Sequence, residues 1–451
     1  MTARNATADD PLWGALPRPW IWILSLLALS AFLTQVKLLP GLRNNLGPFE
    51  VLGALLIGVV FLAQGRSVPW HPLTCAALGL LAIGALSQVN IEYAGAEAGL
   101  VYTAILAFFA LLLASWDALV VRYRIHPVAI MRIVVWSALA VSPWIVSQTI
   151  TDPYLLTEEV GPFRNRAHMG NYMLTVFWLA FAYAQVPRLP RLERLAGYLG
   201  AGVSLYAIAV SGRRSVYLSL FLGLFALAAS FVVARSRRGR VLMGIALALG
   251  LLFAMYRVGS RWVPKLGFFQ ARVGQIDDRL REALAPDDEM MVQQSFASTQ
   301  LEGVKAGFSA HPLLGTGWGG FFRSQYSLDR HEIHSTPLRF LTETGLVGLA
   351  LYVLFMALLF RVAGRSFVVL RTGPWGPVAL TFLVALSSMS ISYLYNRHIT
   401  ERTFWLFVIV LSAMDRAVER DRRSQISAVA ARAAASRGRL APSVHGGSVP
   451  G

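Results

Sequence analysis

Runs of about twenty apolar residues recur along this chain and limit its possible folds more than any other feature, because about twenty helical residues cross a bilayer. Hydrophobic residues make up 55% of the 451 residues and charged residues 14%, whereas roughly 25% of an ordinary soluble domain is charged. The mean hydropathy is +0.54. We therefore predict an all-α, polytopic integral membrane protein and exclude a set of soluble domains.

The apolar runs predict about twelve transmembrane helices. They span residues 19–39, 48–64, 70–88, 98–115, 127–149, 168–186, 195–211, 215–234, 240–257, 344–361, 374–393 and 401–415. An alternative for the first run is a secretory signal peptide, since Arg18 precedes it. The run is too long for a typical signal core and further spans follow, so we interpret it as an uncleaved helix.

Arginine positions predict the orientation of these helices. The net charge is +17, and arginines gather in alternate connections and in the tail: Arg66, Arg122, Arg124, Arg188, Arg191, Arg194, Arg235, Arg237, Arg238, Arg240, Arg361, Arg365, Arg371 and the residues after Asp415. The positive-inside rule makes this side the cytoplasm, so both termini are expected inside. The basic charge is explained in this way, and we expect membrane lipids but no nucleic acid as partners.

One long connection falls on the opposite side and is expected to be a periplasmic loop that folds onto the membrane helices. We accordingly divide the chain into residues 1–257 with transmembrane helices one to nine, the loop 258–343, residues 344–415 with helices ten to twelve, and a basic cytoplasmic tail, 416–451. The single cysteine, Cys75, permits no intramolecular disulfide.

Four motifs occur in a fixed order along the chain. The first, Gly161-Pro-Phe-Arg-Asn-Arg-Ala-His-Met-Gly170, lies at the entry to a predicted span, and the second, Ser211-Gly-Arg-Arg-Ser215, lies in the turn between two predicted spans. Two lie in and after the long loop: His311-Pro-Leu-Leu-Gly-Thr-Gly-Trp-Gly-Gly-Phe321 and His331-Glu-Ile-His-Ser-Thr-Pro-Leu-Arg-Phe-Leu-Thr-Glu-Thr-Gly345. In kind and order they resemble the O-antigen ligase and polymerase superfamily of bacterial envelope membrane proteins, over roughly residues 45–415. The chain departs from the family pattern at Ser335, Pro337 and Gln300, where asparagine, tyrosine and arginine are usual.

The resemblance implies a membrane glycosyltransferase of lipopolysaccharide or other surface-polysaccharide biosynthesis. Such an enzyme transfers a glycan from an undecaprenyl-pyrophosphate carrier to an acceptor hydroxyl, on lipid A–core in a ligase or on another lipid-linked repeat in a polymerase. The site would lie on the periplasmic face of the bacterial cytoplasmic membrane. No cofactor is expected, because the pyrophosphate–sugar bond supplies the energy.

Arg213 and Arg214 lie between two apolar spans on the predicted outer side, where the positive-inside rule disfavours arginine. A charge held at the membrane is costly and usually has a partner or a function, and the planar guanidinium suits a phosphate. The alternative is that both side chains extend to lipid head groups. The resemblance matches Arg214 to the family's motif arginine, which implies that it stabilises the leaving pyrophosphate with Arg213 in support.

His334 occupies the family's histidine position, and the resemblance implies that it is catalytic together with Arg214. An imidazole titrates near neutral pH and can take a proton from a sugar hydroxyl. His331 lies three residues earlier, but this spacing differs from the i,i+4 spacing of a zinc helix and no third ligand is evident. We therefore expect no metal and assign His331 to substrate binding.

Further basic residues are expected near this site. Arg164 and Arg166 precede an outer span entrance and Arg397 lies in a short outer loop, so we predict that they bind substrate. Interfacial anchoring is the alternative. Gly315, Gly317 and Gly320 match a dinucleotide fingerprint only formally, because the strand–helix context is missing, and we interpret them as a turn.

A secondary transporter is the alternative from another class of function, since twelve spans with both termini inside is a common transporter layout. Such transporters often show two related halves and a cytoplasmic middle loop. Here no repeat is visible, and the long loop comes late in the chain and on the predicted outer side.

Overall fold

The computed structural model describes residues 17–33, 47–64, 70–151, 163, 166–211, 214–233, 301–327, 333, 335–394 and 401–439. Its helices include α1 (Arg18–Phe32), α2 (Pro48–Gln64), α3 (Pro72–Leu86), α4 (Ala96–Tyr123), α5 (Pro127–Thr151), α6 (Arg166–Ala184), α7 (Arg191–Ser211), α8 (Arg214–Val233), α12 (Thr336–Leu370), α13 (Gly376–Tyr393) and α14 (Arg402–Arg439). Residues 301–310 are also helical. Short 3-10 helices occur at η1 (Ser87–Asn90), η2 (Tyr93–Gly95) and η3 (Phe321–Arg323). The all-α prediction is confirmed for this part of the chain, and the predicted span 240–257 lies outside it.

Within the described ranges, six helices are long and apolar enough to cross a membrane. They are Pro72–Asn90, Tyr93–Tyr123, Pro127–Gln148, Arg191–Ser211, Thr336–Leu370 and Gly376–Tyr393. Shorter apolar helices occur at Arg18–Phe32, Pro48–Leu62 and Ser215–Ser230. These lengths and compositions are those of a membrane protein.

Several predicted boundaries differ from the structure: α1 ends at Phe32 instead of residue 39, α12 continues to Leu370 instead of residue 361, and α14 continues to Arg439 instead of residue 415. The span predicted at 98–115 is part of α4, which continues to Tyr123, because Asp117 is buried and paired rather than exposed at a helix end. The span predicted at 344–361 is preceded by two further helical turns, since α12 starts at Thr336 with Pro337 in its first turn. Gly345 breaks the helical conformation of α12 with φ 67°, close to the predicted start.

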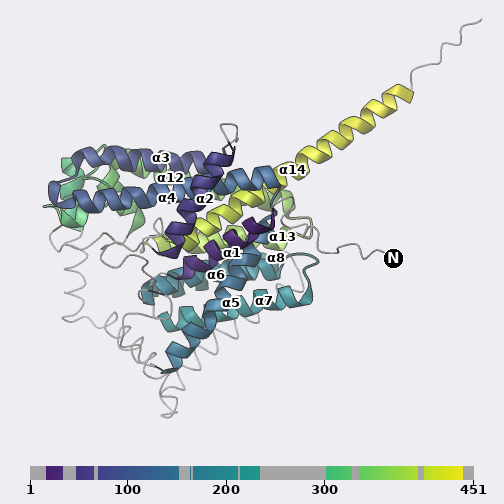
Figure 1. Cartoon of the computed structure of the whole chain (residues 1–451), viewed down its shortest axis with the longest axis horizontal. Helices are drawn as coiled ribbons and strands as arrows, with labels where there is room; N and C mark the ends of the chain where they lie inside the picture. Colours follow the sequence, from purple (N-terminus) through teal and green to yellow (C-terminus); the bar gives the residue numbers. More distant parts are fainter. Residues whose placement is uncertain are drawn as a thin grey trace, which may run out of the picture.

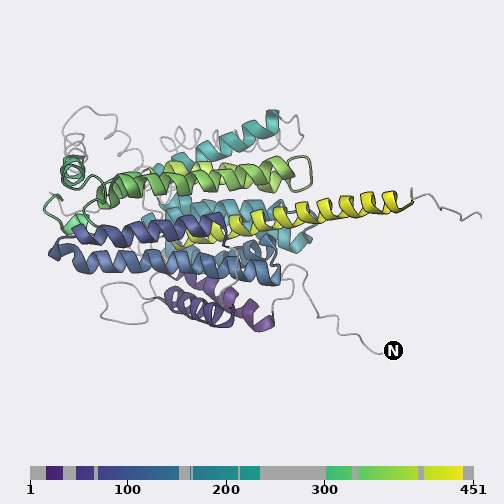
Figure 2. The same ribbon diagram turned by 90° about the horizontal axis from the view of Figure 1, so that it is seen from above.

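The helices form one packed bundle, in which α3, α4 and α12 lie side by side and α14 passes through and continues beyond one end (Figures 1 and 2). Small residues allow close helix approach, as is usual in membrane bundles. A Cβ at Gly197 of α7 would lie 2.9 Å from the Cβ of Ala184 in α6. The indole of Trp178 in α6 donates to Ser388 of α13, at 3.2 Å, and the Ser388 hydroxyl donates to the Ser219 carbonyl of α8, at 2.6 Å. These contacts fix α6, α8 and α13 relative to one another.

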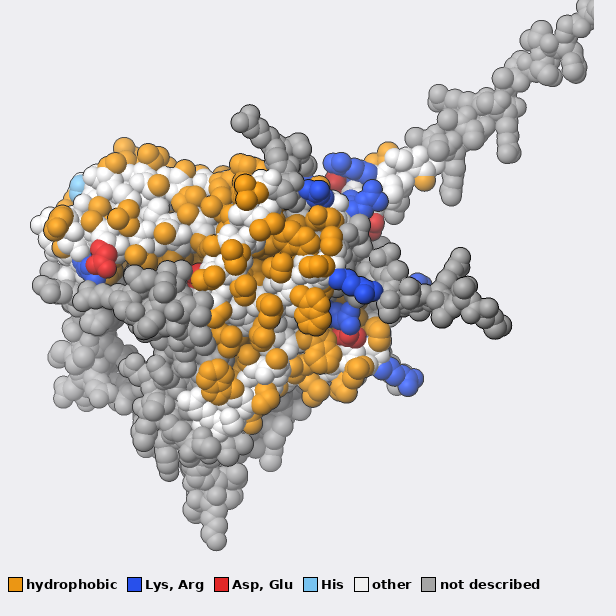
Figure 3. All heavy atoms as spheres, viewed as in Figure 1, with side chains coloured by type: hydrophobic (Ala, Val, Ile, Leu, Met, Phe, Trp, Pro, Cys, Tyr) orange, Lys and Arg blue, Asp and Glu red, His pale blue; other side chains and the backbone are white. Residues whose placement is uncertain are grey.

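Basic side chains gather at the end where α14 leaves the bundle (Figure 3), and buried carboxylates lie beneath them. Asp117 of α4 accepts hydrogen bonds from Arg416 of α14, from Nε at 3.0 Å and Nη2 at 2.8 Å. It also accepts one from the backbone N–H of His71, at 2.8 Å. The His71 Nε2 lies 3.1 Å from Asp415. Because buried charges need partners, this network ties α14 to the start of α3 and to α4. We call this the basic end.

Candidate functional site

The residues predicted to bind or act on substrate lie mostly outside the described part of the chain. This holds for His331, His334, Arg164, Arg213 and Arg397. Arg166 and Arg214 are the first residues of α6 and α8, and only their backbone positions are described. Their predicted roles stay predictions, and the site is therefore built from the described residues around them.

The starts of α6 and α8 pack against each other. A Cβ at Gly170 in α6 would lie 2.7 Å from the hydroxyl oxygen of Ser211, the last residue of α7, and 3.5 Å from Val216 in α8. Any larger residue at position 170 would require at least the Ser211 side chain to move. The structure thus brings together the helix starts at Arg166 and Arg214, which belong to two different sequence motifs.

A group of polar residues lies beside these starts, and we call it the helix-start cluster: Glu50 of α2, Asn171 and Tyr172 of α6, Ser392 of α13, Glu401, and Arg402 of α14. The Asn171 side-chain amide donates to Glu401 Oε1 at 2.8 Å, and the Ser392 hydroxyl lies 3.5 Å from Asn171 Oδ1. Glu401 is only 6% exposed. The cluster therefore holds a buried carboxylate between α6 and α14.

Arg402 joins the same cluster to α2. Its Nε and Nη2 each donate to a carboxylate oxygen of Glu50 at 2.8 Å, a paired geometry that orients both side chains. Its backbone N–H lies 3.4 Å from the Tyr172 hydroxyl. Arg402 is 6% exposed, so the pair is largely shielded from solvent. Because Asp415 follows on α14 at the basic end, the cluster lies about 20 Å away from that end along the helix.

No role was predicted for Glu50, Glu401 or Arg402. Glu401 and Arg402 are adjacent charges at the edge of a predicted span, and ionisable residues in that position usually serve a function. This signal was available in the sequence. Their partners, however, are hundreds of positions away and could not be assigned without the fold.

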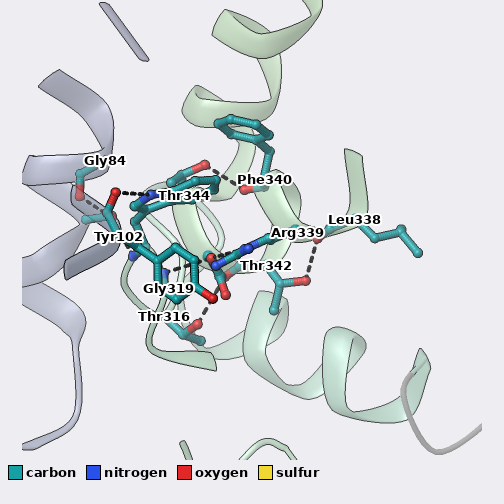
Figure 4. Close-up of polar contacts among 12 residues, drawn as sticks. Gly84, Tyr102, Thr316, Gly319, Leu338, Arg339, Phe340, Thr342 and Thr344 are labelled. Carbon is teal, nitrogen blue, oxygen red and sulfur yellow. Dashed lines mark hydrogen bonds and ion pairs between the residues drawn. The ribbon is translucent and has the colours of Figure 1, made fainter. Parts of the chain in front are cut away.

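A second group anchors the segment 301–327 to the start of α12, and we call it the loop anchor: Tyr102, Trp318, Gly319, Arg339 and Glu343 (Figure 4). Glu343 Oε2 accepts hydrogen bonds from Arg339 Nε and from the Gly319 backbone N–H, both at 2.8 Å. The Arg339 guanidinium carbon lies 4.3 Å from the centre of the Tyr102 ring and 4.8 Å from that of Trp318. Such cation–π contacts stabilise a buried guanidinium.

Glycines shape the turn that docks on this anchor. Gly315, Gly317 and Gly319 have φ of 70°, 99° and 79°, a region in which other residues are strained. The backbone N–H groups of Thr316 and Gly317 donate to the carbonyls of Thr342 and Glu343, at 2.9 and 3.0 Å. The predicted turn at Gly315, Gly317 and Gly320 is found, since Gly315 and Gly320 lie in turns, but the third glycine with positive φ is Gly319 rather than Gly320.

The loop anchor holds the chain on both sides of His334. Ile333 is buried against Val304 and Phe321 of the docked segment. Ser335 precedes the first turn of α12, and its carbonyl accepts from the Arg339 backbone N–H at 2.9 Å. Ile333 is thus fixed by tertiary contacts and Ser335 by the backbone hydrogen bond that starts α12. Arg339 was not singled out in the sequence, and Glu343 was noted only as part of a motif.

Aromatic side chains connect the loop anchor with the helix-start cluster. The ring of Trp318 lies 4.8 Å from that of Phe340, which stacks at 4.8 Å on Tyr352. One turn further along α12, Phe355 contacts Phe404 of α14, which lies two residues after Arg402, at 6.3 Å between ring centres. The two groups are thus joined by a row of packed aromatic side chains.

Across the described residues, no group of three or more histidine, cysteine, aspartate and glutamate side chains is arranged to hold a metal ion. His331 and His334 are not among these residues, so the expectation of a metal-independent site stays a prediction.

No protein-family model matches this chain, and no curated protein matches it either. The resemblance to the ligase and polymerase superfamily therefore rests on the four motifs.

Proposed function

We propose that this protein is a membrane glycosyltransferase of the O-antigen ligase and polymerase type. In this proposal twelve helices cross the bacterial cytoplasmic membrane and residues 258–343 form a periplasmic loop. The basic end faces the cytoplasm, as the positive-inside rule requires. The helix-start cluster and the docked segment 301–327 then face the periplasm, where a lipid-linked donor presents its head group.

One observation carries the proposal: the helix starts at Arg166 and Arg214 are packed together beside the buried Glu401, at the end away from the basic end. Arginine is disfavoured on the outer side of a membrane protein unless it has a partner or a function. Two arginine-bearing motifs that meet there would form a cationic site at the depth of a lipid pyrophosphate. One guanidinium group can donate two parallel hydrogen bonds to the oxygens of a phosphate, which suits a pyrophosphate ligand.

The proposed reaction is a substitution at the sugar carbon that is bonded to the pyrophosphate. The acceptor hydroxyl oxygen forms the new bond and its proton passes to His334, while the bond to the pyrophosphate oxygen breaks. Arg214 stabilises the charge that develops on the leaving group, with Arg213, Arg164, Arg166, Arg397 and His331 binding the substrates. Stabilisation of developing charge is usually the largest single contribution to such catalysis.

The direct test is transfer by the purified full-length protein in proteoliposomes that contain an undecaprenyl-pyrophosphate-linked glycan and an acceptor. We expect the rate of glycan transfer to be unchanged by EDTA, because arginine and histidine side chains rather than a metal ion are proposed to stabilise the charge of the leaving pyrophosphate. Deletion of the gene should leave lipid-linked polymer if the protein is a ligase and single lipid-linked repeats if it is a polymerase. Substrate flux across the vesicle membrane without transfer would instead support a transporter.

Glu401 is proposed as a positioning residue, because its carboxylate holds Asn171 and hence the first turns of α6, where Arg166 begins. We expect Glu401→Ala and Asn171→Ala to raise the KM for the lipid-linked donor by about tenfold, the equivalent of one hydrogen bond to a charged group. Their double mutant should be hardly worse, since both remove the same contact. Glu401→Gln should restore most of the affinity, because its amide oxygen still accepts from Asn171.

The matched control for these variants is Ser390→Ala on α13, since the Ser390 hydroxyl bonds only within its own helix, to the Leu386 carbonyl at 2.7 Å. Steady-state kinetics of the folded proteins separates KM from kcat. An unchanged KM in Glu401→Ala, or a Glu401→Gln variant as impaired as Glu401→Ala, would exclude this positioning role.

A further inference from the structure

Four buried polar side chains at the basic end have no hydrogen-bond partner among the described residues, and we call them the polar layer. The unpaired atoms are the hydroxyl oxygens of three residues and the indole nitrogen of the fourth: Thr74, Ser366, Ser412 and Trp116. Each of these residues is at most 3% exposed. Unsatisfied buried polar groups are costly and uncommon in folded proteins, so each of them needs an explanation.

The polar layer takes one residue from each of four neighbouring helices. Thr74 lies in α3, Trp116 in α4, Ser366 in α12 and Ser412 in α14. Both α4 and α12 pack against α3 and against α14, and they lie on either side of these two helices (Figure 2). The four helices therefore surround a common axis.

The packing of α4 on α14 brings two members of the layer to one interface. The rings of Phe109 in α4 and Trp405 in α14 are stacked, with 5.4 Å between their centres. Both helices run from there toward the basic end, and a residue two turns later lies on nearly the same side of its helix. Trp116 and Ser412 are those residues, so they lie on the facing sides of α4 and α14.

The members on α3 and α12 lie near the same level, beside Asp415. The side chains of His71 and Asp415 meet at 3.1 Å. Thr74 lies one turn further into the bundle than His71, on the same side of α3. Ser366 follows Arg365, whose Nη1 lies 3.7 Å from Asp415 Oδ1. The polar layer and this carboxylate thus lie within about one helical turn of one another along the bundle.

Asp415 brings a negative charge to the polar layer that the described residues balance only in part. Its Oδ2 contacts His71, whose Nδ1 accepts the Leu73 backbone N–H at 3.2 Å, so the ring carries its proton on Nε2 and is neutral. Its Oδ1 is buried without a hydrogen bond to a described residue, and Arg365 at 3.7 Å is also paired with Glu419. A buried charge needs a partner, so this carboxylate favours a cation.

The oxygen atoms available select the kind of cation. Three hydroxyl oxygens and one carboxylate oxygen are hard ligands, which suit alkali and alkaline-earth ions rather than transition metals. A divalent ion usually takes several carboxylates, whereas a single, partly balanced carboxylate matches one positive charge. Each hydroxyl oxygen has a second lone pair, so one of them can also accept the Trp116 indole N–H.

We propose that the polar layer and Asp415 bind a monovalent alkali cation that ties α3, α4, α12 and α14 together at the basic end. The site lies about 20 Å from the helix-start cluster along α14, and the inference does not rest on the proposed function. Water molecules without an ion are the competing occupant, and the experiment distinguishes the two.

The test is thermal unfolding of the full-length, detergent-solubilised protein in sodium, potassium and choline chloride at equal ionic strength. A ligand that binds only the folded state stabilises it, so the wild type should melt at least about 2 °C higher in sodium or potassium than in choline. Asp415→Asn and Ser412→Ala should lose this difference. Ser115→Ala is the matched control and should keep it, because the buried Ser115 hydroxyl donates within α4, to the Leu111 carbonyl at 2.8 Å.

Ser412→Ala also reports on the layer without the ion. In choline chloride this variant should melt at or above the wild-type temperature, since it removes a hydroxyl that has no ion to coordinate. Equal melting temperatures of the wild type in all three salts would show that water alone fills the layer and would overturn the proposal. A cation-dependent difference that persists in Asp415→Asn or Ser412→Ala overturns it too, because the ion would then bind elsewhere. If Asp415→Asn does not fold, Ser412→Ala alone decides.

Discussion

Replacing Glu343 with alanine is expected to destabilise the folded protein by about 3–5 kcal/mol, the usual cost of removing one partner from a buried ion pair. The change leaves Arg339, which is 1% exposed, without its carboxylate, and it removes the acceptor for the Gly319 backbone N–H. The docked segment 301–327 should then detach from α12. Thermal unfolding of the detergent-solubilised protein measures the loss, and limited proteolysis within 301–327 reports the detachment.

Glu97→Ala is the matched control for Glu343→Ala. Glu97 forms an ion pair with Arg323 at 3.3 Å, but the two side chains are 60% and 32% exposed. Exposed ion pairs contribute about 0–1 kcal/mol, so Glu97→Ala should hardly change the melting temperature. If Glu343→Ala and Glu97→Ala had the same melting temperature, the buried pair of Arg339 and Glu343 would not be what holds the segment 301–327 in place.

The largest functional effect is expected for His334 and Arg214. Removing a charged hydrogen-bond donor at a developing charge costs about 2.7–4 kcal/mol, so Arg214→Ala should lower kcat at least about a hundredfold. His334→Ala removes the proposed general base, which typically contributes about a hundredfold or more, so its kcat should fall by at least a similar factor. Arg214→Lys should be nearly as impaired, because an ammonium group cannot reproduce the planar guanidinium. Groups that act on one transition state are non-additive, so the double mutant should be little worse than either single mutant.

These variants are measured by glycan transfer in proteoliposomes after the amount of folded protein has been matched. Arg323→Ala is a suitable control, because it removes a partly exposed arginine from the docked segment 301–327. Near-normal transfer by well-folded His334→Ala would remove the central residue of the mechanism. Arg214 would then be interpreted as a lipid anchor.

The helical architecture was predictable because long apolar runs have few alternatives in a bilayer. Two of the boundary errors occurred where a charge or a proline was misinterpreted. The span predicted to end at residue 115 stops just before Asp117, but Arg416 pairs with this carboxylate and the His71 backbone N–H donates to it, so α4 continues to Tyr123. Ser335 and Pro337 were assigned to the loop, although serine followed by a first-turn proline is a helix-start signal.

The candidate site was predictable only in part. Motifs indicated the helix starts at Arg166 and Arg214, but nothing in the sequence pairs Glu50 with Arg402 or Asn171 with Glu401, which are 352 and 230 positions apart. Such pairs depend on which helices become neighbours. The same holds for the loop anchor, since Tyr102 in α4 meets Arg339 only after α3, α4 and α12 have packed together.

The continuity of α14 has a practical consequence for imaging this protein. The helix runs unbroken from Arg402 to Arg439, and its pairs with Asp117 and His71 fix it where it leaves the bundle. Beyond Asp415 it extends about 36 Å (Figure 2). Membrane proteins without a large soluble domain give electron-microscopy particles that are difficult to align. A helical fusion partner joined in register after Arg439 would move with the transmembrane helices and supply the missing alignment marker.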